Sequence, residues 1–342
     1  MGTFSGYGDF GQNGSVDAAD YVIWRKLNGT SGITPFSLAD GTGDGEIDQE
    51  DLQVWHSHYG EVVPAPTWVF LPPVAPITPT NPEQTVRVIV LNFEPTVPSQ
   101  GNQKLWEVFG WNDPRDLAAG FLNDVEYASG RAINYEIVEW RDLNEFPIFE
   151  DGTRYTADQY VQNRITNTGW STSTADFYAI AEQQGLAELV NNNVIDEIWA
   201  FGDHYFSLFG EAWMAGPQSF FINGPSFPDF EVDRAVAGFG FNYERGIAEM
   251  IHNLGHRTEN HGSRAYGGWN IVNPSTPWDY FTANVGQTSA TAFGVGSTHY
   301  PVNGVTDYDT SNTGVVNSYA DEFVLNFPNQ NYANVRPSSR DA

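Results

Sequence analysis

From residue 85 onward, short apolar runs alternate with longer segments in which apolar residues recur every three or four positions. The short runs predict buried strands over residues 85–95, 132–140, 194–203, 218–225 and 234–241. The longer segments predict helices over residues 116–130, 174–193 and 242–260. Because strands alternate with helices, we expect residues 85–335 to form an α/β domain with a mostly parallel sheet. After Gly262 the periodicity fades, which predicts an irregular C-terminal segment.

The predicted helix over residues 242–260 has two distinct faces. At about 100° per residue, one side collects Ile247, Met250, Ile251 and Leu254, and the other collects Glu249, His252, His256 and Glu259. We expect the apolar side to pack on the sheet. Two histidines four positions apart can bind one metal ion, so the polar side predicts a site for Zn²⁺ or another divalent transition metal. His261 is the third predicted ligand, with Asp279 as a further one, both from the loop expected to follow the helix.

Glu249 and Glu259 are candidate catalytic residues, because each lies three positions from one of the paired histidines. Either carboxylate could instead bind the metal or orient an imidazole through its second nitrogen. A purely structural interpretation also remains open, since Glu and His at these spacings form stabilising pairs on the surface of many helices.

Residues 252–256, HNLGH, resemble the HELGH form of the zincin motif. Asn253 stands where a zinc protease has the glutamate that activates the metal-bound water, and an amide cannot accept that proton. The resemblance therefore implies a metal-binding helix and argues against ordinary zincin proteolysis. A zincin-like relative that has lost hydrolysis is one alternative.

Polar residues also follow the predicted strands, and ligands of open α/β sheets bind beyond the carboxyl ends of strands. These residues are Glu94, Asp203, His204 and the segment 242–245, and His204 is a further candidate catalytic residue. Glu244 and His256 lie twelve residues apart, or about 18 Å along a helix. We therefore expect that one pocket does not use both ends of the helix. His299, Asp307 and Asp309 lie in a later loop whose composition suits sugar or calcium binding, or an ordinary surface loop.

The N-terminal sequence contains a repeat, because residues 9–29 align with residues 40–60. Oxygen ligands at loop positions 1, 3, 5, 9 and 12 can surround Ca²⁺, and a glycine at position 6 allows the sharp turn. The predicted calcium ligands are Asp9, Asn13, Asp17 and Asp20 in the first loop and Asp40, Thr42, Asp44, Asp48 and Asp51 in the second. The apolar residues at position 8, Val16 and Ile47, are expected to let the two loops pair.

This repeat resembles a type I dockerin, which has two loop–helix calcium half-hands with Asp at position 12. The resemblance implies a small all-α, EF-hand-like module over residues 1–60 and an extracellular or cell-surface location. It also implies a cohesin-type partner module and an association with polysaccharide degradation.

Between the two parts, residues 61–84 contain seven prolines and predict an extended linker, and residues 336–342 are assigned to a tail. The net charge of −28 disfavours nucleic acid as a partner, and no apolar run is long enough to span a membrane. Cysteine is absent, so thiol chemistry is excluded. We expect an extracellular hydrolase, directed at a glycan or a peptide, whose substrate is a biopolymer such as polysaccharide. The alternative is a non-enzymatic carbohydrate-binding or cell-surface protein.

Overall fold

The computed structural model describes residues 8–10, 15–16, 18–32, 38–61, 84–326, 329–332 and 335–338. The chain divides into two compact units, Met1–Thr78 and Pro79–Ala342. The division falls within the predicted linker, of which residues 62–83 lie outside the described part of the chain. Among the described residues, no helix combines the length and the apolar character that crossing a bilayer requires.

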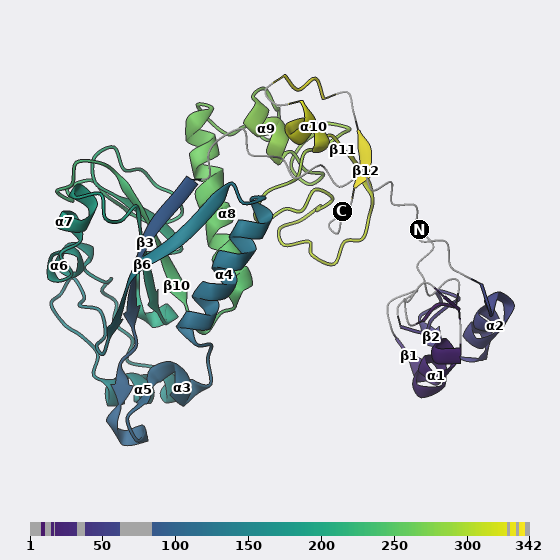
Figure 1. Ribbon diagram of the computed structural model, residues 1–342, viewed down its shortest axis with the longest axis horizontal. Helices are drawn as coiled ribbons and strands as arrows, with labels where there is room; N and C mark the ends of the chain where they lie inside the picture. Colours follow the sequence, from purple (N-terminus) through teal and green to yellow (C-terminus); the bar gives the residue numbers. More distant parts are fainter. Residues whose placement is uncertain are drawn as a thin grey trace. The chain divides into compact units, whose positions relative to one another are not determined.

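A six-stranded mixed sheet forms the centre of the larger unit, with the strand order β6-β3-β7-β10-β8-β9 (Figure 1). The strands are β3 (Gln84–Phe93), β6 (Ile133–Leu143), β7 (Glu197–Gly202), β8 (Ala212–Ala215), β9 (Ser226–Phe227) and β10 (Val236–Asn242). Strands β6, β3, β7 and β10 are parallel, whereas β8 is antiparallel to β10. The mostly parallel sheet and its helices confirm the predicted α/β architecture of this unit.

Helices cover both faces of the sheet, as Figure 1 shows, with α4 and α8 on one side and α6 and α7 on the other. The helices of this region are α3 (Leu105–Phe109), α4 (Pro114–Ala128), α5 (Ala157–Thr166), α6 (Phe177–Gln183), α7 (Leu186–Asn191) and α8 (Ile247–Ala265). Short elements connect them: β4 (Thr96–Val97), η2 (Pro98–Gln100), β5 (Gln103–Lys104) and η3 (His204–Phe206). Strand β7 is buried along its whole length, because helices lie above and below it.

Three predicted elements differ from the observed ones. The helix expected over residues 174–193 is two helices, since Gly185 adopts a left-handed conformation between α6 and α7. The strand expected over residues 218–225 is not formed. At Gly224 a side chain would lie 2.5 Å from the carbonyl oxygen of Ala212, so this segment is a tight loop against β8. Helix α8 begins five residues later than expected, at Ile247, because Asn242 still belongs to β10.

The C-terminal part of the larger unit is irregular, as the sequence predicted, with a few short elements. These are α9 (Pro277–Thr282), β11 (Val316–Ser318), α10 (Asp321–Leu325) and β12 (Arg336–Ser338). Strands β11 and β12 pair antiparallel. The segment Arg336–Ser338, assigned to a tail from the sequence, therefore belongs to the fold of this unit.

The N-terminal unit contains helices α1 (Ala18–Leu27) and α2 (Gln49–His58) and the short antiparallel strands β1 (Thr30–Ser31) and β2 (Glu46–Ile47). It is therefore not purely helical. Its core includes Phe10, Trp24, Ala39 and Ile47.

The two halves of the N-terminal unit are related as the repeat predicts. The backbone N–H of Gly29 donates to the carbonyl of Ile47 at 2.7 Å, and that of Gly60 donates to the carbonyl of Val16 at 2.9 Å. These two hydrogen bonds are equivalent under the alignment of residues 9–29 with residues 40–60. Each loop thus pairs, through Val16 or Ile47, with the end of the other loop's helix.

Candidate metal centre and the adjoining cleft

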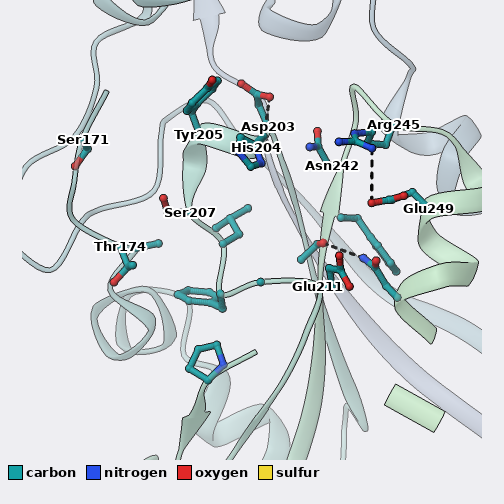
Figure 2. Close-up of a pocket in the computed structure, with 18 of the residues that line it drawn as sticks. Ser171, Thr174, Asp203, His204, Tyr205, Ser207, Glu211, Asn242, Arg245 and Glu249 are labelled. Carbon is teal, nitrogen blue, oxygen red and sulfur yellow. Dashed lines mark hydrogen bonds and ion pairs between the residues drawn. The ribbon is translucent and has the colours of Figure 1, made fainter. Parts of the chain in front are cut away.

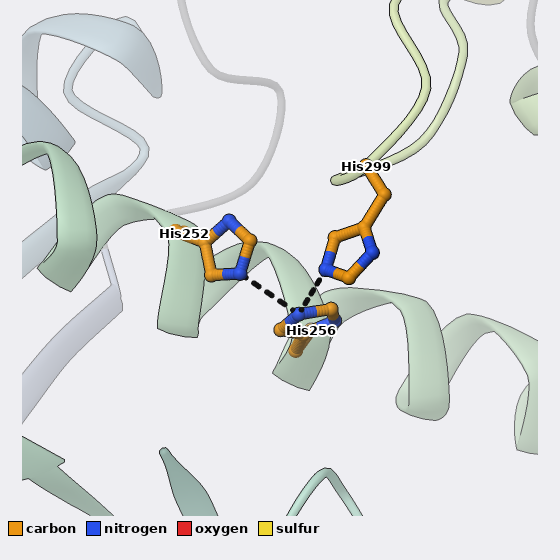
Figure 3. A group of neighbouring side chains, drawn as sticks. All are labelled: His252, His256 and His299. Atoms are coloured by element: carbon orange, nitrogen blue, oxygen red, sulfur yellow. Dashed lines mark hydrogen bonds between the residues drawn. The ribbon is translucent and has the colours of Figure 1, made fainter. Parts of the chain in front are cut away.

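Three imidazole rings converge beside helix α8. Figure 3 shows His252 and His256 on α8 and His299 on a loop that faces the helix. The Nε2 atom of His256 lies 3.0 Å from Nε2 of His252 and 3.1 Å from Nε2 of His299. Within the described part of the chain, the ligand atoms of these three histidines all lie within 4.8 Å of one another. The group confirms that His252 and His256 lie in a cluster that could hold a metal ion.

Carboxylates behind two of the rings determine where their protons lie. Nδ1 of His256 is 3.0 Å from Oε2 of Glu259, and Nδ1 of His299 is 3.1 Å from Oδ1 of Asp307. A carboxylate can only accept, so each Nδ1 carries the hydrogen, and in the neutral ring each Nε2 presents a lone pair. Two such lone pairs 3.1 Å apart repel each other unless a cation or an additional proton lies between them. The arrangement is therefore suited to bind a cation.

Neighbouring groups shift the pKa values of the helical histidines in opposite directions. The hydrogen bond that His256 donates to Glu259 raises the pKa of His256, whereas burial and the adjacent His256 lower the pKa of His252. Burial would raise the pKa of Glu259, but hydrogen bonds from His256 and Thr298 outweigh it, so this pKa lies below its usual value. Glu259 is thus an ionised group that orients His256 from behind.

Glu259 and Glu249 occupy different places on α8. The side chain of Glu259 is 10% exposed, and its two oxygens are engaged by His256 and by the backbone N–H of Thr298 at 2.6 Å. It therefore acts on His256 and does not face the open side of the cluster. Glu249 lies one turn before the histidines, 3.9 Å from Arg245, on the wall of a cleft.

The other two predicted ligands lie elsewhere. Helix α8 continues to Ala265, so His261 is helical, and five residues at about 100° each turn it about 140° away from His256. Its Nδ1 contacts the carbonyl oxygen of Arg257 at 2.8 Å. Asp279 accepts backbone hydrogen bonds from Asn270 and Thr276 and caps α9. His299 provides the third imidazole instead.

Two further residues reach the cluster, and the sequence analysis did not select either of them. Oε2 of Glu211, the residue before β8, is 3.6 Å from Nε2 of His256. The hydroxyl of Tyr308 is 2.8 Å from Nε2 of His299 and 3.4 Å from Nε2 of His252. No spacing relates Glu211 to the helix, whereas Tyr308 stands next to Asp307 in the loop already noted for its composition.

A cleft of about 730 Å³ lies beyond the carboxyl ends of β7 and β10. Figure 2 shows Asp203, His204, Asn242, Arg245, Glu249 and Glu211 around it. It follows the first half of α8 as far as Asn253, and Glu211 links it to His256. Neither Glu244 nor His256 lines this cleft, so the expectation that one pocket does not use both ends of this helix stays a prediction.

His204 lines this cleft, as expected for a residue that follows a strand, but it is not part of the imidazole cluster. Asp203 precedes it and accepts a hydrogen bond from its backbone N–H at 2.6 Å. Burial, together with the charge of Glu244, raises the pKa of Asp203 to about 8. Glu94 is engaged away from the cleft, where Lys104 donates to it at 2.7 Å.

Asp309, in the loop whose composition suits sugar or calcium binding or an ordinary surface loop, fixes the turn that carries Tyr308. Its Oδ2 accepts hydrogen bonds from the backbone N–H of Val305 and from the amide of Asn312. The hydrogen bond from Val305 is the main reason why the pKa of Asp309 is lowered.

The acidic groups of the second N-terminal loop are wrapped in backbone hydrogen bonds. Asp40 accepts from Gly43 at 2.6 Å and from Gly45 at 2.9 Å. Asp51 accepts from Gly41 and Thr42 through Oδ1 and from Asp48 through Oδ2.

The other predicted calcium ligands lie in both loops. Asp44 and Asp48 each accept from a backbone N–H two residues ahead, those of Glu46 and Glu50. In the first loop, Asp9 and Asp20 are buried like their counterparts Asp40 and Asp51. Asn13 and Asp17 lie outside the described residues. Calcium binding remains a prediction.

Searches of family models, curated proteins and solved structures find no match to this chain. Function is therefore inferred from the geometry of the imidazole cluster and its cleft.

Proposed function

We propose that this protein is a metal-dependent hydrolase whose His252, His256 and His299 hold Zn²⁺ or a similar divalent transition metal. The observation that carries the proposal is the convergence of three Nε2 atoms, two of which are lone-pair acceptors fixed by carboxylates. Three neutral imidazoles with oriented outer partners are the donor set typical of catalytic zinc sites.

Glu211 would supply the proton acceptor that Asn253 cannot provide. A bound Zn²⁺ lowers the pKa of a coordinated water to about 7. The carboxylate of Glu211 lies on the cleft side of His256, at 3.6 Å from Nε2, and the amide of Asn223 donates to it. It would take one proton from the attacking water and return it to the leaving group, so the bond cleaved gains the elements of water.

The cleft provides the space for a substrate, and its position favours a polymer over a small molecule enclosed on all sides. The amide oxygen of Asn253 is buried there with no hydrogen-bond partner within the described residues. The dockerin-like repeat favours polysaccharide, an extracellular or cell-surface setting and a cohesin-type partner, which we include in the proposal.

A second candidate is a zincin-like or carbohydrate-binding relative without hydrolytic activity. Asn253 favours it, since this residue replaces the glutamate of the zincin motif. This candidate keeps the metal and the cleft and assigns no proton transfer to Glu211.

Zinc binding by matched histidine variants tests the metal centre. We expect the purified full chain to contain one transition metal, and His252→Ala, His256→Ala and His299→Ala each to lose it. His261→Ala is the control, because this residue is on the same helix but turned away. Elemental analysis measures the metal content of each variant, and calorimetric titration measures its affinity for Zn²⁺. Retention of metal by the first three variants would reject the proposed centre.

Hydrolysis of a glycan and peptide panel then separates the two candidates. The zinc-loaded chain should cleave at least one polymer, and Glu211→Gln should reduce the rate about 10²–10⁴-fold while zinc stays bound. Metal binding without cleavage of any member of the panel would favour the inactive relative.

A further inference from the structure

We propose that Tyr308 is a fourth protein ligand of the metal, and that its phenolic oxygen covers the coordination position that a substrate must take. This inference rests on the proposed metal centre.

The distances around Tyr308 fit a ligand sphere. In a tetrahedral zinc site with Zn–N bonds of about 2.0–2.1 Å, neighbouring ligand atoms lie about 3.3 Å apart. The hydroxyl of Tyr308 lies 2.8 and 3.4 Å from Nε2 of His299 and His252. Nε2 of His256 lies 3.0 Å from Nε2 of His252 and 3.1 Å from Nε2 of His299. These four separations among the four atoms are thus close to those of one coordination tetrahedron.

Without an additional proton on one of the rings, hydrogen bonding does not account for this grouping. A phenol has one proton and can donate it to one acceptor at a time. In the neutral ring, Nε2 of His299 presents a lone pair, because Nδ1–H donates to Asp307. Nε2 of the neutral His256 ring also presents a lone pair, because its Nδ1–H donates to Glu259. One proton cannot serve these nitrogens together, whereas one cation can bind all of them and the oxygen.

The backbone delivers Tyr308 and His299 as one unit. The backbone N–H of Tyr308 donates to the carbonyl of His299 at 2.9 Å, and Thr310 donates to the carbonyl of Tyr308 at 2.6 Å. Tyr308 has a φ of 51°, in the left-handed region that is uncommon for a residue with a bulky side chain. Such a conformation persists where the surroundings fix it, and it is often found at functional sites. Asp307, which orients His299, belongs to the same turn.

The ring of Tyr308 is also free to move away. Its residue surface is 52% exposed, and its ring stacks on His252 and tilts against His299. Because about half of this residue already faces solvent, the oxygen can cover the metal in the resting protein and leave when a substrate binds. Glu211 approaches His256 independently of this loop and stays in place.

Copper-loaded protein provides a direct test, because a phenolate bound to Cu(II) gives a charge-transfer band in the visible region. We expect the full chain with one equivalent of Cu(II) to show this band. Tyr308→Phe should lose the band but retain copper, and should bind Zn²⁺ at least about tenfold more weakly. Azide should bind the copper of Tyr308→Phe more tightly than that of the unaltered chain.

Tyr300→Phe is the matched control and should keep the band. Tyr300 follows His299 directly, but in the described part of the chain the tyrosine ring against the histidines is that of Tyr308. Copper binding without the band, or a band that persists in Tyr308→Phe, would overturn this inference and leave the metal centre intact. Equal azide affinity would overturn the covering role. Failure of the unaltered chain to bind Cu(II) or Zn²⁺ would instead overturn the proposed function.

Discussion

At the scale of single residues, two buried carboxyl groups near the sheet are stabilised in different ways. Glu197 is fully buried and receives hydrogen bonds from Arg257 and from the indole of Trp199. Asp203 has no comparable partner, because the nearest guanidinium, that of Arg164, is 3.9 Å away. Arg164 instead pairs with Glu244 at 2.6 Å. Burial beside a second acid therefore keeps Asp203 protonated, and its pKa rises to about 8.

This raised pKa predicts that Asp203 makes the protein less stable as the pH rises. Between the usual aspartate pKa of about 3.9 and the folded value of about 8, the folded state holds a proton that the unfolded state has released. The free energy of unfolding then falls with increasing pH across this window and levels off above it. Asp203→Asn removes the titration, so its stability relative to the unaltered chain should grow with pH, by at most about 1.4 kcal/mol per unit.

Chemical denaturation at several pH values between 4 and 9 measures this difference. Glu244→Gln is the informative control, because it removes the second acid and leaves Arg164 free to pair with Asp203. The pKa of Asp203 should then fall, and most of the pH dependence should disappear. A stability difference between Asp203→Asn and the unaltered chain that does not vary with pH would contradict the prediction.

The residues of the metal centre show which signals a sequence carries. His252 and His256 were found because a helical period of 3.6 places positions i and i+4 on one face. His299 and Tyr308 come from a loop without periodicity, and only tertiary structure brings that loop to α8. The sequence predicts His261 as a metal ligand because the helix is expected to end before it. One extra turn of helix reverses the direction of its side chain.

At the scale of elements, α8 serves both as a packing element and as the carrier of two ligands. Its residue Gly255 faces the loop that carries His299, and a side-chain carbon there would lie 2.6 Å from Oγ1 of Thr298. Thr298 also donates its backbone N–H to Glu259, the residue that orients His256. The close approach of helix and loop at Gly255 therefore sets the position of the third imidazole.

We expect Gly255→Ala to weaken metal binding without a matching loss of stability. The added methyl group should push Thr298 and His299 outward and lower the Zn²⁺ affinity by roughly tenfold or more. Alanine stabilises a helix interior by about 0.8–1 kcal/mol relative to glycine, which should offset much of the strain. Gly246→Ala at the start of α8 is the control, because a side chain there meets no atom within 4 Å. Unchanged Zn²⁺ affinity in Gly255→Ala would show that the loop position does not depend on this contact.

Element prediction succeeded where a strand or helix has a strong pattern of its own. The buried run of β3 and the amphipathic pattern of α8 are examples, and both elements form. The sequence does not predict β8, whose four residues receive their strand conformation by pairing with β10. Element prediction also failed at 218–225, an apolar segment that the close approach to Ala212 holds in a loop. In both places the deciding contacts come from residues distant in sequence or from backbone sterics.

At the scale of the whole molecule, the two units are expected to respond to different cations. The larger unit has an extensive apolar core around the sheet and a site made of imidazoles. Within its described residues, the smaller unit has a core of few residues, and its sequence contains two acidic loops. A unit with so little apolar burial gains a large fraction of its stability from a bound ion. The net charge of −28 makes cations favourable partners for the chain as a whole.

The full chain should therefore unfold in two thermal transitions, which Ca²⁺ and Zn²⁺ shift separately. Ca²⁺ at about 100 times its dissociation constant should stabilise the smaller unit by about 2.7 kcal/mol. This effect should be lost in Asp40→Asn, because Asp40 is the buried first acid of the second loop. The His252→Ala/His256→Ala double variant should keep the response to Ca²⁺ and lose the response to Zn²⁺. Calorimetry measures the two transition temperatures. If Ca²⁺ shifts neither transition, the calcium role is rejected. If a single ion shifts both transitions, the two sites do not act independently.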